Sequence, residues 1–232
     1  MVKAVFFDLG GTLLVMRRDR IFGRVLQEEG RETGLREIHS AYLKAELWWL
    51  SVYGGKLLSP EESVEAYRVL DQKVFEAIFP SESQSEAARV SSLVRKRWHE
   101  LGSEIPLALY PDVEPTLKDL VHDGYSLGLI SNAPPDTGKA VEALGLRKYL
   151  RTEVISGVVG YTKPHPEIFR IALREAGVGP EEAVHVGDLY EADIAGARNA
   201  GIKGILIDRE GSYKNVDCPR IRSLPQVYEY IR

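Results

Sequence analysis

A carboxylate beside a glycine-rich turn is the first feature of this sequence that could do chemistry. Asp8 ends an apolar run and is followed by Gly10, Gly11 and Thr12. Glycine lets the N–H groups of the backbone approach an anion closely, so this turn could hold a negatively charged ligand next to the carboxylate. An aspartate that caps a helix after a turn gives the same pattern. The turn alone leaves both interpretations open.

Three further groups of polar residues have chemistry that matches this turn. Ser131 and Asn132 carry a hydroxyl and an amide that could hold phosphate oxygens. Lys163 could neutralise developing negative charge, and the carboxylates of Asp188 and Asp193 could hold Mg²⁺. Each group by itself also fits a turn residue, a solvated lysine or an aspartate in the first turn of a helix. Their occurrence together predicts one site for a phosphate and a magnesium ion.

Short apolar runs lead into most of these polar residues. The runs cover residues 2–7, 125–132, 183–188 and 204–208, and helical stretches separate them. Strands that alternate with helices predict an α/β fold with a doubly wound parallel sheet and right-handed crossovers. Open sheets of this kind bind ligands at the carboxyl ends of their strands. We therefore expect Asp8, Asn132 and Asp188 to converge in space.

Several helices have ends that can be read from the sequence. Ser59 is followed by a proline and by Glu62, which predicts a helix start with a capping box. A helix closed by Gly124 should include Val121 on its apolar face, and another should run from residue 191 to residue 200.

The strand signal is replaced by helical periodicity between residues 16 and 105. One expected apolar face there contains Leu43, Leu47 and Leu50. Because this stretch leaves the first strand and returns before the second, we predict two domains. Residues 1–15 and 106–232 form an α/β core, and residues 16–105 form an all-helical cap over the carboxyl edge of the sheet.

Four motifs give the chain a resemblance to a known family. They read FFDLGGTL, LISNA, KPHPEIF and VGDLYEADIAGARNAG, in this order along the chain. Their types, their order and the helical insertion resemble the haloacid dehalogenase (HAD) superfamily over nearly the whole chain. The resemblance implies a HAD-like Rossmannoid core with a helical cap, and a hydrolase that needs Mg²⁺.

The resemblance also implies roles for individual residues. Asp8 is the expected nucleophile, and Lys163 is expected to steady the charges of the reaction. Phosphate binding is expected from Gly11, Thr12, Ser131 and Asn132. The expected metal ligands are Asp8, the backbone carbonyl of Gly10 and Asp188, with Asp193 supporting the metal shell or Lys163. The implied reaction passes through an aspartyl-phosphate, which water then hydrolyses.

One position departs from the phosphatases of this family. They carry a second aspartate two residues after the nucleophile, which protonates the leaving group and then activates water, and this chain has Gly10 there. A positioned general acid or base contributes ~10²- to 10⁴-fold to a rate. Metal binding need not suffer, because that position contributes a backbone carbonyl.

The departure leaves four interpretations open. The first is a phosphatase for good leaving groups, or one in which a cap residue such as Asp19 stands in. The second is a phosphonate-cleaving enzyme with a Schiff-base lysine, for which Lys44 and Lys56 are available. The third is a 2-haloacid dehalogenase, which needs no metal and leaves the preserved carboxylates unexplained. The fourth is a non-catalytic protein that binds a phosphate ligand or another protein.

Composition narrows the class of protein further. The 232 residues carry a formal net charge of -4, which provides no basic field for nucleic acid. The single cysteine, Cys218, predicts a reducing, cytoplasmic location, and no apolar stretch is long enough to predict a membrane span. The expected ligand is a small phosphorylated molecule. The sequence does not identify that molecule, and it leaves the oligomeric state open.

Overall fold

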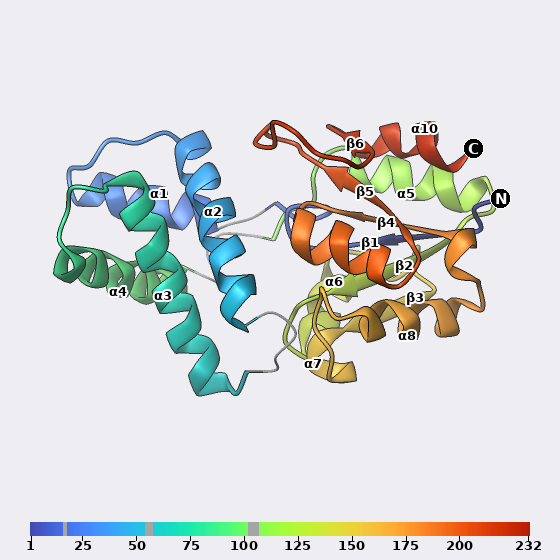
Figure 1. Cartoon of the computed structure of the whole chain (residues 1–232), viewed down its shortest axis with the longest axis horizontal. Helices are drawn as coiled ribbons and strands as arrows, with labels where there is room; N and C mark the ends of the chain where they lie inside the picture. Colours follow the sequence, from blue (N-terminus) through green and yellow to red (C-terminus); the bar gives the residue numbers. More distant parts are fainter. Residues whose placement is uncertain (16–17, 54–57, 102–106) are drawn as a thin grey trace. The chain divides into compact units, whose positions relative to one another are not determined.

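The computed structural model describes residues 1–15, 18–53, 58–101 and 107–232. Contacts within the chain define two compact units, one made mainly of residues 1–15 and 107–232 and the other of the helical residues between them. Figure 1 shows both units in the colours of the sequence.

The first unit is a parallel α/β domain. Its strands are β1 (Ala4–Phe7), β2 (Ser126–Ser131), β3 (Thr152–Ile155), β4 (Ala183–Gly187), β5 (Lys203–Ile207) and β6 (Arg220–Ile221). Its longer helices are α5 (Val113–His122), α6 (Thr137–Ala143) and α8 (Pro166–Ala176). Short helical turns are α7 (Ser156–Val159), η1 (Pro180–Glu182), η2 (Tyr190–Ala195), α9 (Gly196–Asn199), η3 (Leu224–Val227) and α10 (Tyr228–Ile231).

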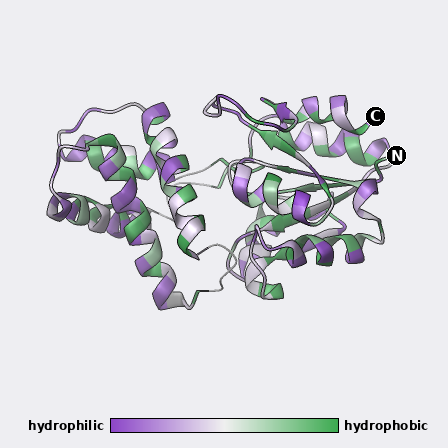
Figure 2. Ribbon diagram, viewed as in Figure 1, coloured by the Kyte–Doolittle hydropathy of each residue, from purple (hydrophilic) through white to green (hydrophobic). Residues whose placement is uncertain are grey.

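The strands lie in the order β3-β2-β1-β4-β5-β6, and every neighbouring pair is parallel. The predicted doubly wound parallel sheet is therefore confirmed. The sheet also contains two strands that the sequence did not predict, β3 and β6. Figure 2 shows the strands as the most hydrophobic part of this unit, as expected for a sheet covered on both faces.

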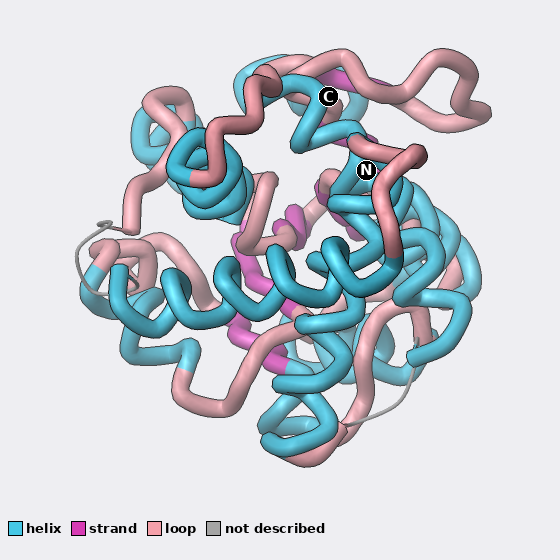
Figure 3. Tube along the Cα trace, turned by 90° about the vertical axis from the view of Figure 1, so that its left-hand side faces the viewer, coloured by secondary structure: helices cyan, strands magenta, loops and turns pink. Residues whose placement is uncertain are grey.

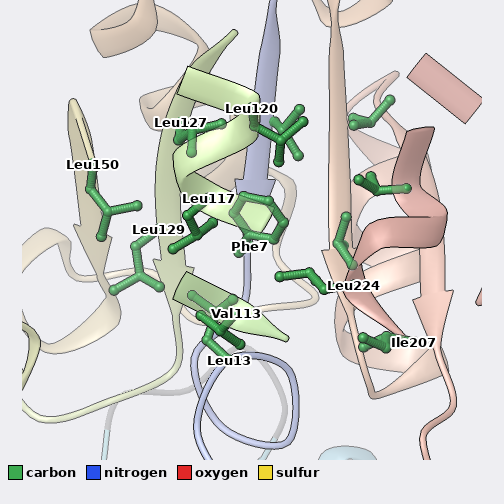
Figure 4. Packing of buried hydrophobic residues seen from close by; sticks show 14 of the residues in the cluster. Phe7, Leu13, Val113, Leu117, Leu120, Leu127, Leu129, Leu150, Ile207 and Leu224 are labelled. Carbon is green, nitrogen blue, oxygen red and sulfur yellow. The ribbon is translucent and has the colours of Figure 1, made fainter. Parts of the chain in front are cut away.

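Alternation along β1 fills both faces of the sheet. Val5 and Phe7 point into a cluster with α5, η3 and α10, whereas Ala4 and Phe6 point into a cluster with α8 and α9. All four side chains are fully buried. Figure 4 shows Phe7 packed among side chains of the first cluster. Burial of this kind contributes about 1.5–3 kcal/mol for each large apolar side chain and holds the end of β1 in place.

All the regular secondary structure in the described residues of the second unit is helical. It contains α1 (Arg18–Glu28), α2 (Leu35–Tyr53), α3 (Pro60–Ile78) and α4 (Gln84–Leu101). Figure 3 separates these helices from the strands by colour. Helix α3 begins at the predicted capping box, in which Ser59 and Glu62 exchange hydrogen bonds. In the part of the chain that the structure describes, no helix is both long enough and apolar enough to cross a membrane.

Two predicted apolar faces are wrong in part. Val121 and Leu47 are 42% and 48% exposed. In α5 the buried side is formed by Val113, Leu117 and Leu120. In α2 the buried side centres on Tyr42, the residue directly before Leu43 of the predicted apolar face. The cause is the same in both helices, because an apolar residue next to a buried one falls about 100° away around the helix.

Candidate active site

Asp8 lies directly after β1, at the point where the strand order changes direction. Strands β2 and β3 follow on one side of β1 and β4 to β6 on the other. Phe7 pairs with Val186 of β4, and the N–H of Asp8 donates to the carbonyl of Val186 over 2.9 Å. Ligands of doubly wound sheets bind in the crevice at this switch point. The fold therefore places the Asp8 carboxylate, 8% exposed, where the sequence predicted a site.

The turn after Asp8 packs closely against the side chain of Asp188. Gly11 has φ of 75°, which favours glycine, and its N–H donates to the carbonyl of Leu14 over 2.8 Å. A Cβ atom at Gly11 would lie 2.1 Å from Oδ2 of Asp188. The two loops therefore touch at this residue. Gly10 forms a bridge with Leu14, and Thr12 is fully buried.

The end of β2 supplies Ser131 and Asn132. Ser131 is 4% exposed and is the last residue of the strand. The amide of Asn132 is used by the backbone of Lys163: its Nδ2 donates to the carbonyl over 2.9 Å, and its Oδ1 accepts from the N–H over 2.7 Å. Asn132 therefore positions Lys163, and Ser131 is the candidate phosphate-binding side chain at this strand end.

Lys163 joins two of the predicted carboxylates. Its Nζ atom lies 2.6 Å from Oδ1 of Asp8 and 2.5 Å from Oδ1 of Asp193. Lys163 is 2% exposed and Asp193 is 1% exposed, so this ion pair is nearly free of solvent. Charges at this depth interact far more strongly than on the surface. From the sequence alone, Lys163 could also have been an ordinary solvated surface lysine. Its burial and its two contacts exclude that interpretation.

Asp193 is held by more groups than Lys163 alone. Its Oδ1 is 2.9 Å from Nε2 of His185, and its Oδ2 accepts from the N–H of Leu189 over 3.0 Å. An ionised carboxylate only accepts hydrogen bonds, so a neutral His185 must carry its proton on Nε2. Both oxygens of Asp193 are thus engaged inside the protein. This geometry fits the support of Lys163, one of the two roles expected for Asp193.

The two carboxylates around Lys163 differ in electrostatic state. Burial raises the pKa of Asp8 to about 6, and the attraction of Lys163 only partly offsets it. Burial acts on Asp193 in the same direction, but Lys163 and His185 outweigh it and hold the pKa of Asp193 well below its usual range. Burial would lower the pKa of Lys163, yet both carboxylates together raise it. At neutral pH Asp8 is ionised but destabilised, which suits a reactive carboxylate.

The arrangement fits the predicted magnesium ligands. Mg²⁺ prefers carboxylate and carbonyl oxygens and is bound by one or two carboxylates rather than by a closed protein cage. Asp188 touches the turn that follows Asp8, as the close approach to Gly11 shows. Among the described residues, no group of three or more acidic, histidine or cysteine side chains is arranged so that it could hold a metal ion by itself. Two carboxylates, of Asp8 and Asp188, with the carbonyl of Gly10 are the set that could hold the ion.

Two other residues singled out from the sequence, Asp19 and Lys44, lie in the helical unit. Oδ2 of Asp19 lies 2.8 Å from Nδ1 of His39, and Lys44 is exposed on α2. Lys56 lies outside the described residues.

The core supplies two site residues that the sequence did not identify. His185 lies 2.9 Å from Asp193 through its Nε2, and Arg209 donates to the carbonyl of Thr12 over 2.9 Å. The spacing of His185 and Asp193 was a signal for the first, whereas nothing local in the sequence marks the second.

Comparisons with known proteins agree with this geometry. A family described as haloacid dehalogenase-like hydrolase matches residues 2–201. This chain belongs to the haloacid dehalogenase-like hydrolases. A glyceraldehyde 3-phosphate phosphatase of Methanopyrus kandleri is 32% identical over 219 residues, which cover 94% of this chain and 88% of that protein. A phosphoserine phosphatase of Thermus thermophilus is 41% identical over 102 residues, 44% of this chain and 41% of that protein.

Solved structures of HAD proteins have the same fold. A HAD phosphatase from Thermococcus onnurineus has a TM-score of 0.59 and 23% identity, covering 98% of this chain and 97% of that one. A 2-haloacid dehalogenase from Pseudomonas syringae has a TM-score of 0.58 and 27% identity, covering 99% and 97%. The HAD fold thus hosts both phosphate and halide chemistry among similar proteins, and the choice between them depends on the site residues.

Proposed function

We propose that this HAD-like hydrolase is a Mg²⁺-dependent phosphoric-monoester hydrolase that acts on a small phosphorylated metabolite. The observation that carries the proposal is the buried contact of Lys163 with both Asp8 and Asp193 at the switch point of the sheet. A lysine that neutralises a nucleophile and an incoming phosphoryl group requires this position. Relatives named as phosphatases support the same choice. The single cysteine remains the argument for a cytoplasmic location.

In the proposed reaction Asp8 attacks phosphorus with one carboxylate oxygen. The bond between phosphorus and the oxygen of the leaving group breaks, and an aspartyl-phosphate forms. Water then attacks phosphorus, which releases inorganic phosphate and restores Asp8. Lys163 balances the charge of Asp8, and Ser131 donates its hydroxyl to a phosphate oxygen. A bound Mg²⁺ would supply further positive charge at the phosphoryl oxygens.

Gly10 limits the proposed reaction, because it provides no side chain to protonate the leaving group. Restoring the carboxyl group in a Gly10→Asp variant should raise turnover for alkyl phosphates, by up to about 10²-fold, and should change turnover for aryl phosphates much less. Aryl leaving groups depart without a proton, so they serve as the internal control. Equal effects on both classes would show that the missing acid is not what limits turnover.

The dehalogenase alternative keeps one specific argument in its favour. Gly10 lacks the phosphatase carboxylate, and a 2-haloacid dehalogenase is among the similar structures. Against it, Asp188 is preserved beside the nucleophile turn. The phosphonate-cleaving alternative needs a lysine of lowered pKa in a desolvated place, and Lys44, the one of its two candidate lysines that the structure describes, is exposed. These observations therefore favour phosphate monoesters as the substrates.

A single-turnover reaction in heavy-oxygen water separates the two hydrolases. In the proposed reaction water attacks phosphorus, so the heavy oxygen enters inorganic phosphate and Asp8 stays unlabelled. In a dehalogenase water attacks the carbonyl carbon of the Asp8 ester, so the label enters the carboxylate of Asp8. Mass spectrometry of the peptide that contains Asp8 reads the outcome. Label in that peptide, with halide released from a 2-haloacid, would overturn the proposal.

A further inference from the structure

The backbone on either side of Leu189 is held by a tyrosine from a later part of the chain. The hydroxyl of Tyr213 donates to the carbonyl of Asp188 and accepts from the N–H of Tyr190, both over 3.2 Å. The N–H of Leu189, between them, donates to Oδ2 of Asp193 over 3.0 Å. Three consecutive residues are thus each fixed by a side chain. One of them, Asp188, is a predicted metal ligand.

Tyr213 is itself fixed by a buried aspartate. Asp208 follows β5 directly and is 4% exposed. Its two oxygens accept from the N–H groups of Ser212, over 2.7 Å, and of Tyr213, over 3.3 Å. Arg220 donates to the carbonyl of Tyr213 over 2.5 Å and lies 3.6 Å from Asp208. The end of a core strand therefore sets where the Tyr213 hydroxyl lies.

The position of the Asp188 backbone determines how its carboxylate meets the nucleophile turn. Oδ2 of Asp188 lies so close to Gly11 that a single added Cβ atom would approach it to 2.1 Å. Mg²⁺ demands ligand positions close to ideal octahedral geometry, so a small displacement of one ligand weakens binding. A residue that fixes the Asp188 carbonyl therefore acts on the cation through the carboxylate of the same residue.

We propose that Tyr213 is a positioning residue for Asp188 and so tunes the affinity of the site for a divalent cation. The inference rests on the proposed function, because it takes Asp188 as a ligand of Mg²⁺. Tyr213 touches neither the substrate nor the reacting atoms in this scheme. It acts through its hydrogen bonds to the backbone of Asp188 and Tyr190.

The test replaces Tyr213 with phenylalanine, which removes the hydroxyl and keeps the ring. A Tyr228→Phe variant is the matched control, since it removes a hydroxyl that bonds Asp123 in the same unit. Mg²⁺ binding is measured by isothermal titration calorimetry and by the shift of Tm with added Mg²⁺. For Tyr213→Phe we expect Mg²⁺ binding to weaken by about 10-fold, at the lower end of effects for groups that orient metal ligands. The control should bind as the wild type does.

Two further readouts separate positioning from a general loss of structure. Amide hydrogen exchange of residues 188–190 should become faster in Tyr213→Phe, while kcat at saturating Mg²⁺ and the KM for substrate should stay near wild type. An Asp208→Asn variant, which loosens the turn without changing Tyr213, should shift Mg²⁺ binding in the same direction.

Each contradicting outcome has a distinct meaning. Unchanged Mg²⁺ binding in Tyr213→Phe, with or without a lower metal-free Tm, would overturn the inference and leave the proposed function intact. A wild-type protein that binds no Mg²⁺ would overturn both. Weakened binding in Tyr228→Phe as large as in Tyr213→Phe would also overturn the inference, because the effect would not depend on Asp188.

Discussion

Asp8 and Asp193 share one lysine, yet removal of their charges should have opposite effects on stability. Their oxygens lie 2.6 and 2.5 Å from Nζ of Lys163. Burial raises the pKa of Asp8 from 3.8 to about 6, whereas Asp193 is held below its usual range despite its burial. A raised pKa means that the folded chain binds the Asp8 proton more tightly than the unfolded chain does. The stability from that proton is complete below pH 3.8 and is lost as the pH rises through about 6.

The size of the effect follows from this change in pKa. At about 1.4 kcal/mol for each pH unit, a rise from 3.8 to about 6 corresponds to about 3 kcal/mol against the ionised, folded state. Asp8→Asn removes the charge and keeps the size of the side chain. Without divalent metal, we expect this variant to exceed the wild type by about 1–3 kcal/mol in free energy of unfolding above pH 7. The difference should become small near pH 4.

Asp193→Asn is the matched control for this experiment. It should destabilise the protein by about 3 kcal/mol at neutral pH, because it leaves Lys163 and His185 short of a buried carboxylate. Urea unfolding followed by circular dichroism, in EDTA at pH 4, 5.5 and 8, measures both variants. The reasoning would be refuted if Asp8→Asn lost as much stability as Asp193→Asn at pH 8.

Three further changes test other parts of the structure. Gly11→Ala should displace Asp188, because the Cβ of the new alanine would lie 2.1 Å from Oδ2 of Asp188. We expect turnover in a phosphate-release assay to fall more than about 10-fold, and full activity would contradict this close approach. Asp71→Ala should destabilise the helical unit by about 3–5 kcal/mol, because Arg95 and the hydroxyl of Tyr42 lose a fully buried partner. Urea unfolding followed by tryptophan fluorescence measures the change, and a loss below about 1 kcal/mol would count against these contacts of Asp71. Ser59→Ala should lower the free energy of unfolding by about 1 kcal/mol, since it removes the cap of α3, and an unchanged Tm would show that the cap contributes nothing.

Much of the core could be predicted from the sequence because its signals are local. Strand β1 is an uninterrupted apolar run that stops at Asp8, and mainly apolar runs that lead into a polar residue mark β2, β4 and β5. Strand β3 contains Glu153, and β6 has only two residues. Neither gives an apolar run long enough to recognise. Their pairing depends on neighbours in the sheet rather than on their own sequence.

The candidate site could be predicted in part for the same reason. The fold class predicts that Asp8 and Asp188, at the ends of strands, belong to the site. It does not predict the role of Asn132. Its amide bonds the backbone of Lys163, 31 positions later in the chain. The predicted helix from residue 191 also begins one residue earlier, as the π-helix η2. Such a turn depends on contacts with distant parts of the chain, here the hydrogen bond from the N–H of Tyr190 to the hydroxyl of Tyr213.

Release of inorganic phosphate from a panel of phosphate monoesters, with and without Mg²⁺, tests the central claim most directly. Asp8→Asn provides the background, since its amide cannot act as the carboxylate nucleophile and the variant is expected to stay folded. The account predicts release that requires Mg²⁺ and disappears in Asp8→Asn. Release that persisted in Asp8→Asn, or a wild-type protein that bound Mg²⁺ and released nothing above that background, would contradict it.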